Sequence, residues 1–351
     1  MKICFVLPKY SRQPIGGFKI VFEYANRLCI DGNQVSLLFL NQHIFSGRKM
    51  PARLKKMAAH FLTLHEPTWF PLNPKIKKYS FLDRPLKDEV IHCDWVIATS
   101  ASTVDIVQKY FNCSKKAYMI QDYESWDQTE EYLHKTYAMG MKNIAVASWL
   151  KSIVDQYAQE SSTLIRNPVD VNIYRPEVDV HQRNPYTIGM LYHRAKQKGC
   201  KYAIEAIKIA RKKHPEITLQ MFGAYIPDFR LPEWVTFTHN ASQDETVRIY
   251  NSCSIFVCAT IQEGFGLTGL EAMSCGDAFI STNYLGVREY AVNGENALLS
   301  PVKDTSKLAE NICRVIEDDD LRFNLAENAI KSAESMSWEQ AYETFKQTLK
   351  L

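Results

Sequence analysis

Short apolar runs of strand length alternate along this chain with longer segments whose apolar residues recur at helical spacing. The first run covers residues 3–7, the helical spacing covers residues 18–28, and a second run covers residues 34–40. A strand, a helix and a strand in this order predict a βαβ unit, and such units build parallel sheets. The chain therefore starts as an α/β fold.

The same alternation continues along the rest of the chain. Further strands are predicted at 93–100, 116–121, 143–147, 186–191, 217–222, 234–238, 254–261 and 278–283. Helices are predicted at 102–110, 148–157, 202–212, 243–250, 270–276, 305–316 and 321–335, with a last one from residue 337. Ser148 is a candidate N-cap, and Gly276 is a candidate C-terminal stop.

Length and composition narrow the class of protein. A chain of 351 residues is long for one core, so two domains are expected, with their junction between Asn167 and Asn184. The net charge of +3 favours no particular polyanion. The nine cysteines form no C-x-x-C pair and no Cys/His cluster, so neither disulfides nor a zinc site is indicated and a reducing cytoplasm fits. The first eight residues are interpreted as a strand and not as a signal peptide, and no apolar stretch approaches a membrane span.

The stretch 254–301 carries the most chemistry. Its apolar run leads through a glycine-rich turn into a helix that ends at Gly276. Free amides at a helix start, the helix dipole and small residues together favour a phosphate ligand. Two carboxylates flank the turn, with Glu263 before it and Glu271 inside the helix.

One interpretation of this turn is a dinucleotide site, because Gly264, Gly266 and Gly269 match G-x-G-x-x-G. In a dinucleotide fold an acidic residue should end the next strand and hold a ribose. The next predicted strand ends in Asn283, and the match lies late in the chain. A nicotinamide oxidoreductase is therefore disfavoured, although tight NADH binding would revive it.

A second interpretation rests on several landmarks in a fixed order. Glu263 and Glu271 enclose the glycine turn, and the segments 283–289 and 293–301 follow. This region resembles the donor-binding region of the family 4 (group 1) glycosyltransferases, with weaker similarity of 121–124 to a subset found in bacterial surface-glycan and rhamnosyl-transfer systems. Leu285 departs from the family, which often has a second glycine there before Gly286.

The resemblance implies an α/β protein of GT-B type, with two Rossmann-like parallel-sheet domains that face a cleft. The first would be an acceptor domain at 1–170, and the second a nucleotide-sugar-binding domain at 171–336. The segment 337–351 would be a helix that returns to the first domain. The family members are retaining enzymes that use nucleotide sugars, so we expect front-face attack with the departing phosphate taking the acceptor's proton.

The resemblance also assigns roles to residues of the second domain. Glu271 would bind the ribose, and Glu263 would bind a sugar hydroxyl and favour positive charge at the anomeric carbon. The remaining donor-binding residues would be Phe265, Gly266 and Leu267 at the sugar and Thr268 and Gly269 at the phosphates. Without the resemblance, a capped, solvated helix start would be the favoured interpretation of the glutamate pair.

Two cations lie on a predicted strand-to-helix loop of this domain. Arg194 and Lys198 could neutralise a leaving diphosphate without a metal ion, although such a loop is often only solvated. Lys198 followed by Gly199 fits the family's diphosphate pattern, whereas Arg194 is one position away from the common spacing. Asp318–Asp320 matches a D-x-D metal motif, but its place between two helices favours a capping turn. No metal or other cofactor is expected.

The first domain offers fewer candidates. Gly16 and Gly17 open a helix and could receive a phosphate or a sugar hydroxyl, or they could form a tight turn that needs positive φ. The resemblance implies that they bind the donor, because the family has a glycine-rich loop here that faces the donor across the cleft. Asp122 follows a strand, where it could hold acceptor or sugar or could cap a helix. Many family members place a histidine in this domain near the reacting sugar, but neither His92 nor His134 can be assigned to that role.

The segment 46–74 is predicted to be irregular and basic. Its cations, interleaved with Met50, Leu54, Met57 and Phe61, are Arg48, Lys49, Arg53, Lys55 and Lys56. Such a surface can rest on anionic lipid, or it can be a solvated helix face. The resemblance favours lipid, because many members act on lipid-linked acceptors at the cytoplasmic leaflet.

These observations predict a glycosyltransferase that moves a sugar from a nucleoside diphosphate sugar to a glycan or lipid-linked acceptor in bacterial surface-polysaccharide synthesis. Its place would be the cytoplasm, with peripheral attachment at the inner face of the cell membrane. No nucleic-acid partner is expected. Two alternatives keep the same fold: a catalytically silent nucleotide-sugar-binding subunit and a sugar-nucleotide epimerase.

Overall fold

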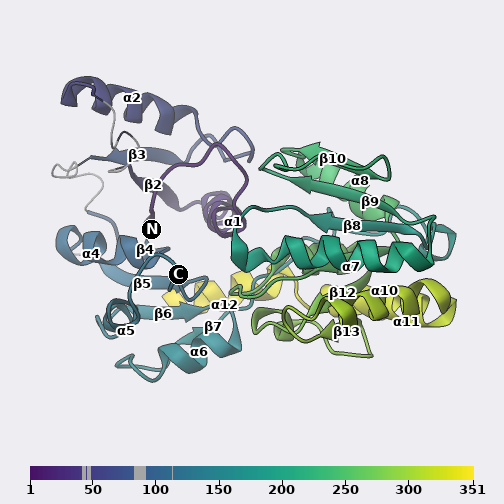
Figure 1. Cartoon of the computed structure of the whole chain (residues 1–351). Coiled ribbons are helices and arrows are strands. Elements are labelled where there is room, and N and C mark those ends of the chain that lie inside the picture. Colours follow the sequence, from purple (N-terminus) through teal and green to yellow (C-terminus); the bar gives the residue numbers. More distant parts are fainter. Residues whose placement is uncertain (42–44, 46–48, 83–91, 113) are drawn as a thin grey trace. The chain divides into compact units, whose positions relative to one another are not determined.

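The computed structural model describes residues 1–41, 45, 49–82, 92–112 and 114–351 (Figure 1). These residues form two compact units. The first unit comprises Met1–Ile165 together with Thr344–Leu351, and the second comprises Arg166–Glu343. Each unit is built around its own parallel sheet. The α/β fold class predicted from the sequence is confirmed.

The first unit contains a seven-stranded sheet in the order β3-β2-β1-β4-β5-β6-β7, with every strand pair parallel. Its strands are β1 (Lys2–Leu7), β2 (Gln34–Leu40), β3 (Lys77–Phe81), β4 (Trp95–Ala98), β5 (Lys115–Ile120), β6 (Lys142–Ala145) and β7 (Thr163–Leu164). Residues 3–7 of β1 are all buried, as expected for the centre of a sheet covered on both faces.

The helices of the first unit are α1 (Gly16–Ile30), α2 (Ala52–His65), α4 (Ala101–Tyr110), α5 (Glu130–Tyr137) and α6 (Ser148–Val154). The end of α12 (Trp338–Leu349) also belongs to this unit. There the fully buried Phe345 ring lies 6.5 Å from the ring of Phe5 and 4.4 Å from that of Tyr24. The last residues of the chain therefore complete the core that its first strand begins.

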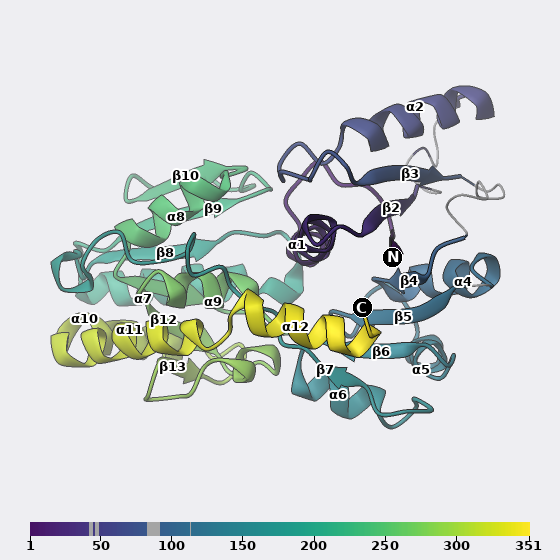
Figure 2. The same ribbon diagram turned by 180° about the vertical axis from the view of Figure 1, so that it is seen from behind.

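The second unit contains a six-stranded parallel sheet in the order β10-β9-β8-β11-β12-β13. Its strands are β8 (Thr187–Leu191), β9 (Thr218–Gly223), β10 (Val235–His239), β11 (Ile255–Cys258), β12 (Ala278–Thr282) and β13 (Ala297–Ser300). Its helices are α7 (Cys200–Lys213), α8 (Gln243–Ser252), α9 (Leu267–Ser274), α10 (Thr305–Glu317) and α11 (Asp319–Glu334). From behind, α11 is seen to follow α10, and it packs against α9 and β12 (Figure 2).

The strand order of the second unit determines where a ligand can enter. The chain winds outward from β8 through β9 to β10, and then begins again at β11 on the other side of β8. The loops that follow β8 and β11 therefore leave their strands in opposite directions. Such a topological switch point leaves a crevice at the carboxyl ends of the two strands, which is the usual ligand site of open α/β sheets.

Several local predictions can be compared with the structure. Gly276 does follow α9 with φ of 85°, and Asp318 does cap α11 by accepting the N–H of Leu321 at 2.9 Å. Ser148 is not an N-cap, because it is already the first helical residue and Ala147 occupies the cap. The irregular structure predicted for 46–74 is wrong in its middle, where α2 forms. Among the described residues, no helix is both long and apolar enough to span a membrane.

Candidate functional site

The glycine turn before α9 is shaped by two buried tyrosines. Gly266 has φ of 101°, and a Cβ at this position would lie 2.0 Å from the Tyr284 hydroxyl and 2.8 Å from that of Tyr290. The Tyr290 hydroxyl donates to the Gly266 carbonyl at 2.7 Å, and the two hydroxyls are 3.2 Å apart. Any larger residue at 266 would displace this tyrosine pair, whose role the sequence analysis missed.

The start of the same loop is held by Gly286. A Cβ on Gly286 would lie 2.6 Å from the carbonyl oxygen of Glu263, so the two backbones are in direct contact. Its neighbour Leu285 has φ of −61° and is 45% exposed. That backbone conformation suits any residue, so the departure from the family pattern at Leu285 leaves the loop undisturbed.

The loop after β8 meets the loop after β11 at the switch point. Gly199, the N-cap of α7, has φ of 61°, and a Cβ there would lie 1.8 Å from the carbonyl oxygen of Ala259. The Ile261 N–H donates to the Gln197 carbonyl at 2.7 Å. These contacts place Lys198 beside Glu263, and its ammonium forms an ion pair with that carboxylate. Both side chains are 23% exposed.

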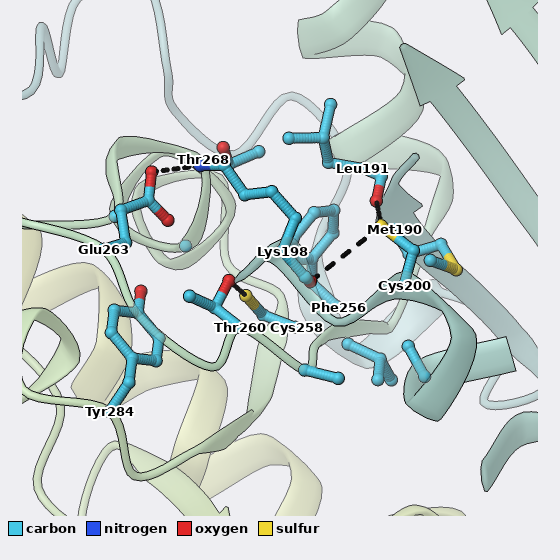
Figure 3. Close-up of a pocket in the computed structure, with 15 residues that line it drawn as sticks. Met190, Leu191, Lys198, Cys200, Phe256, Cys258, Thr260, Glu263, Thr268 and Tyr284 are labelled. Carbon is cyan, nitrogen blue, oxygen red and sulfur yellow. Dashed lines mark hydrogen bonds and ion pairs between the residues drawn. The ribbon is translucent and has the colours of Figure 1, made fainter. Parts of the chain in front are cut away.

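A cavity opens at this meeting point (Figure 3). The Lys198 side chain extends toward Glu263, and the wall includes Cys200, Thr260, Thr268 and Tyr284. The first amides of a helix have no partner within the helix, and the helix dipole makes this end electropositive. The start of α9 therefore adds amide donors to a cavity that already holds one cation and one carboxylate.

Glu271 lies one turn further along α9. Its carboxylate accepts a hydrogen bond from the Tyr250 hydroxyl of α8 at 3.2 Å. Tyr250 is fully buried, and burial raises the pKa of its hydroxyl, with the Glu271 charge as the next cause. Tyr250 therefore remains a protonated donor that fixes the carboxylate, a contact that the sequence analysis missed.

The structure separates the two cations that were expected to converge. The Arg194 guanidinium donates to the Ile226 carbonyl at 2.7 Å and lies over the Tyr225 ring, in the loop after β9. It is absent from the described lining of the cavity, whereas Lys198 is present. Next to Arg194, His193 accepts the N–H of Ala195 on Nδ1 at 3.0 Å. Burial lowers the pKa of this imidazole, and the charge of Lys198 lowers it further.

The remaining predicted residues of the second unit occupy the turn itself. Phe265 is buried, and its ring centroid lies 5.4 Å from that of Tyr290. Leu267 and Thr268 are the first residues of α9. A Cβ on Gly269 would lie 2.6 Å from a carbon of the Phe279 ring and from the Tyr290 hydroxyl. Side chains thus pack below the turn, and its backbone is what remains for a ligand.

In the first unit, the start of α1 lies beside the end of β5. Gly16 and Gly17 are the first residues of α1, and neither has positive φ, so the tight-turn interpretation is wrong. A Cβ on Gly17 would instead lie 3.0 Å from Oε1 of Gln121, after β5. That buried amide oxygen has no hydrogen-bond partner among the described residues. Gln121 is a candidate ligand contact that the sequence analysis did not single out.

The two acidic residues after β5, Asp122 and Glu124, make different contacts. Glu124 accepts from the Ser100 hydroxyl at 2.7 Å and from the Ala101 N–H at 3.2 Å, at the start of α4. Burial raises the pKa of this carboxyl group. Asp122 accepts the N–H of Tyr123 at 2.8 Å. Asp122 is not the N-cap of the following helix α5, because Thr129 occupies that position.

A histidine does lie beside this cluster. The His134 Nε2 and the Tyr123 hydroxyl are 3.0 Å apart, and the imidazole stacks on the Tyr157 ring at 3.8 Å. Sequence reasoning could place His134 only in a helix, because its partners come from two other segments of the chain.

One group of possible metal ligands occurs among the described residues. The ligand atoms of His214, Cys313 and Glu317 lie within 4.8 Å of one another, at the C-terminal ends of α7 and α10. Glu317 also accepts from the Lys213 ammonium at 2.5 Å. The cation beside it opposes a metal ion, and the contacts of Glu317 with Lys213 and His214 account for the cluster. The cluster also lies at the opposite end of α7 from Gly199, away from the cavity.

Comparison with known proteins agrees with this geometry. Residues 176–332 match the family described as Glycosyl transferases group 1. This stretch is a group 1 glycosyltransferase domain. The chain is 28% identical over 203 residues to an uncharacterized glycosyltransferase of Methanocaldococcus jannaschii, covering 57% of this chain and 56% of the relative.

Bacterial relatives share the same region. The Staphylococcus aureus capsular polysaccharide biosynthesis glycosyltransferase CapM is 28% identical over 176 residues, covering 46% of each chain. The Campylobacter jejuni N,N'-diacetylbacillosaminyl-diphospho-undecaprenol alpha-1,3-N-acetylgalactosaminyltransferase is 35% identical over 92 residues, covering 26% of this chain and 24% of that enzyme. The matches thus span about half the length of the first two relatives and less of the third.

Solved structures extend the likeness to the whole chain. Anabaena HepE, in complex with UDP and glucose, has a TM-score of 0.76 at 17% identity, covering 100% of this chain and 99% of that chain. Sucrose-phosphate synthase from Thermosynechococcus elongatus has a TM-score of 0.75 at 16% identity, covering 100% and 98%. At these identities the likeness establishes the fold, which is the GT-B fold of two Rossmann-like units.

Proposed function

We propose that this protein is a retaining hexosyltransferase. It moves a sugar from a nucleoside diphosphate sugar to a glycan or lipid-linked acceptor, in the synthesis of a bacterial surface polysaccharide. The observation that carries the proposal is the cavity at the switch point of the group 1 domain, where Lys198, Glu263 and the start of α9 converge. The capsular and undecaprenol-linked activities named for the relatives support the choice of acceptor.

The donor would be held by its three parts. The diphosphate would lie at Thr268 and Gly269, at the start of α9, where the helix dipole favours negative charge. Glu271, already oriented by Tyr250, would accept hydrogen bonds from the ribose hydroxyls. The diphosphate would replace Glu263 as the partner of Lys198, which leaves the carboxylate of Glu263 for a sugar hydroxyl.

Front-face attack suits this arrangement better than a double displacement. A double displacement needs a carboxylate nucleophile beside the anomeric carbon. Among the described residues that line the cavity, Glu263 is the one carboxylate, and the proposal assigns it to a sugar hydroxyl. In the proposed reaction the acceptor oxygen forms the new bond as the bond to the diphosphate breaks. The departing phosphate takes the acceptor's proton.

The charge of the leaving group would be balanced by the protein alone. Lys198 and the amides of α9 would stabilise the negative charge that develops on the diphosphate. We therefore propose that no metal ion takes part. Transfer in excess EDTA tests this: a rate equal to that in Mg²⁺ supports the proposal, and a rate restored only by a divalent cation opposes it.

The acceptor would use the carboxyl ends of the first unit's strands. Asp122 after β5 is the proposed contact for the acceptor or the sugar, because open α/β sheets bind ligands at such ends. The start of α1, at Gly16 and Gly17, is proposed to contact the donor. Arg194 could contribute to the diphosphate only after leaving Ile226. We further propose that the protein works in the cytoplasm, attached to the inner face of the membrane that carries its acceptor.

Thermal-shift screening against UDP-, GDP-, dTDP- and CMP-sugars tests the donor site, since a ligand that binds only the folded state raises the melting point. The best donor is then incubated with bacterial lipid-linked saccharides, and both the nucleoside diphosphate and the product linkage are analysed. Transfer with retention supports the proposal. Binding without diphosphate release on addition of acceptor would indicate a silent subunit, and an isomerised donor would indicate an epimerase.

A further inference from the structure

Helix α2 carries an exposed apolar stripe that nothing in the described structure covers. The stripe consists of Leu54, Met57, Phe61 and Leu64, which are 52%, 68%, 59% and 47% exposed. Their spacing of three, four and three residues places them on one face of the helix. Isolated exposed apolar residues are ordinary, but four on one face form a patch.

The opposite face of α2 is buried against the rest of the first unit. Ala59 and Thr63 are buried completely, and α2 packs against β3 at the edge of the first unit's sheet. At about 100° per residue, the stripe lies on the far side of the helix from these two residues. The helix is therefore fixed to the protein by one face and presents the other outward.

The charge around the stripe has one sign. Residues 49–65 contain four Lys and Arg residues and no Asp or Glu, whereas the whole chain has a net charge of only +3. These cations are Lys49, Arg53, Lys55 and Lys56, and no described ion pair includes any of them. Arg48, the fifth cation predicted for this surface, lies outside the described residues.

We propose that α2 binds an anionic lipid surface, lying in its plane with the four apolar side chains inserted. Arg53 and Lys56 lie between the stripe and the buried face on one side of the helix, and Lys55 lies on the other, at about 100° per residue. Long cationic side chains there can reach the headgroups while their stems cover apolar surface. A helix with an apolar face flanked by cations and without acids is typical of such interfacial binding.

This inference names the partner of the proposed transferase. It rests on the proposed function in one respect only, namely that the function explains why the protein would need a membrane. Charge decides between the possible occupants. A second copy of this chain would set the same cations against each other, whereas an anionic bilayer is complementary to them. A neutral protein groove would leave the cations without a role.

The test is flotation of the full chain with vesicles of phosphatidylglycerol and phosphatidylcholine in a 1:3 ratio, compared with phosphatidylcholine alone, in about 20 mM and about 500 mM salt. The wild-type protein should float with the anionic vesicles at low salt, and less of it should float in high salt or with neutral lipid. Protein that stays at the bottom with anionic vesicles at low salt overturns the proposal. Since no turnover is measured, that result would leave sugar transfer standing.

Two variants assign the binding to α2. The double variant Met57→Ser/Phe61→Ser should lose most of its flotation, and Lys55→Gln/Lys56→Gln should lower the binding constant about fivefold per cation removed. The matched controls, Ile30→Ser at an apolar residue that is 74% exposed in α1 and Lys135→Gln in α5, should float like the wild type.

Two further results would reassign the stripe. Equal flotation of the wild type and of Met57→Ser/Phe61→Ser would place the membrane contact elsewhere. Sedimentation that shows a dimer in the wild type and a monomer in this variant would make the stripe an interface between copies. Circular dichroism and melting temperature check that each variant is folded, and exposed positions of this kind change stability little.

Discussion

At the residue scale, the site depends on the pairing of Lys198 with Glu263. Each ion is largely removed from water, so each needs the other while the cavity holds no ligand. A diphosphate offers Lys198 a stronger partner, because it carries more negative charge than one carboxylate. Donor binding would then release Glu263 toward the sugar, so that one event both neutralises the leaving group and prepares the sugar contact.

Glu263→Gln should reduce the rate of transfer about a hundredfold or more, because the neutral amide cannot favour positive charge at the anomeric carbon. Binding of the nucleoside diphosphate should persist, since Lys198 then has no carboxylate at position 263 to exchange for it. Steady-state kinetics and calorimetry measure the two effects. Glu310→Gln, on the exposed surface of α10, is the control and should behave as the wild type. Unchanged turnover in Glu263→Gln would remove its proposed role.

Glu271→Gln should weaken nucleotide binding strongly, because an amide offers one acceptor oxygen where the carboxylate offers two. Tyr250→Phe keeps the packing and removes only the hydroxyl that orients Glu271, so affinity should fall about three- to tenfold. Titration with the best nucleotide, followed by calorimetry, gives both values. If Tyr250→Phe weakened binding as much as Glu271→Gln, the tyrosine would have to contact the nucleotide itself.

His193 gives the stability of the protein a dependence on pH. Burial, followed by the charge of Lys198, lowers its pKa in the folded state, whereas in the unfolded chain it titrates near its ordinary value of about 6.5. Below that pH the unfolded state binds more protons, so the free energy of unfolding falls as the pH falls. Urea unfolding at about pH 5.5 and about pH 7.5 should therefore show a smaller difference in His193→Gln than in the wild type. An equal difference in both proteins would contradict this assignment.

At the scale of elements, the turn before α9 is specified by what lies beneath it. Gly266 and Gly294 both have positive φ, at 101° and 82°. A Cβ on Gly266 would collide with the Tyr284 hydroxyl, whereas a Cβ on Gly294 would meet nothing within 4 Å. The two glycines thus share the backbone requirement and differ only in the space around them.

Gly266→Ala should therefore cost more than Gly294→Ala. Both variants incur the cost of positive φ, about 1 kcal/mol for an alanine. Gly266→Ala must in addition displace the tyrosine pair, so its total should reach about 3 kcal/mol, and donor affinity should fall with it. Chemical unfolding and nucleotide titration of the two variants provide the comparison. Equal losses of stability would mean that the tyrosines yield easily and do not define the turn.

The elements differ in how far the sequence could predict them. Strands with continuous apolar runs, such as β1 and β11, and helices with clear periodicity, such as α10, were found within a few residues. Strand β3 was missed because it contains three polar residues in five and lies at the edge of its sheet. Short β13 gave too little pattern for a prediction.

The residues of the site also differ in how far the sequence could locate them. The glycine turn, Glu263 and Lys198 could be located because each follows a strand in the sequence. The contact of Tyr250 with Glu271 and the contact of Tyr290 with Gly266 could not, because a side-chain contact across 21 or 24 residues leaves no periodic signal. The diversion of Arg194 to the Ile226 carbonyl likewise depends on a loop 32 residues away.

At the scale of the whole molecule, residues from both ends of the chain belong to the same unit. The first unit begins at Met1 and is completed by Thr344–Leu351, after the chain has formed the entire second unit. The fully buried Phe345 ring lies against Phe5 and Tyr24, residues of the first strand and first helix. The first unit therefore cannot reach its full stability until the last residues of the chain are available.

Phe345→Ala should destabilise the first unit by about 3–5 kcal/mol, because it removes a buried ring and leaves a cavity. The proposed site for the nucleotide lies within the second unit, so nucleotide should still protect the second unit from unfolding. Hydrogen exchange with and without the nucleotide resolves the two units, with faster exchange expected in β1 and β2 and ligand protection retained in α9.

Phe229→Ala, at a ring that is 41% exposed in the second unit, controls for the loss of a phenylalanine. Unchanged exchange in β1 would show that the C-terminal segment adds little to the core, and loss of ligand protection in α9 would show that the second unit depends on the first.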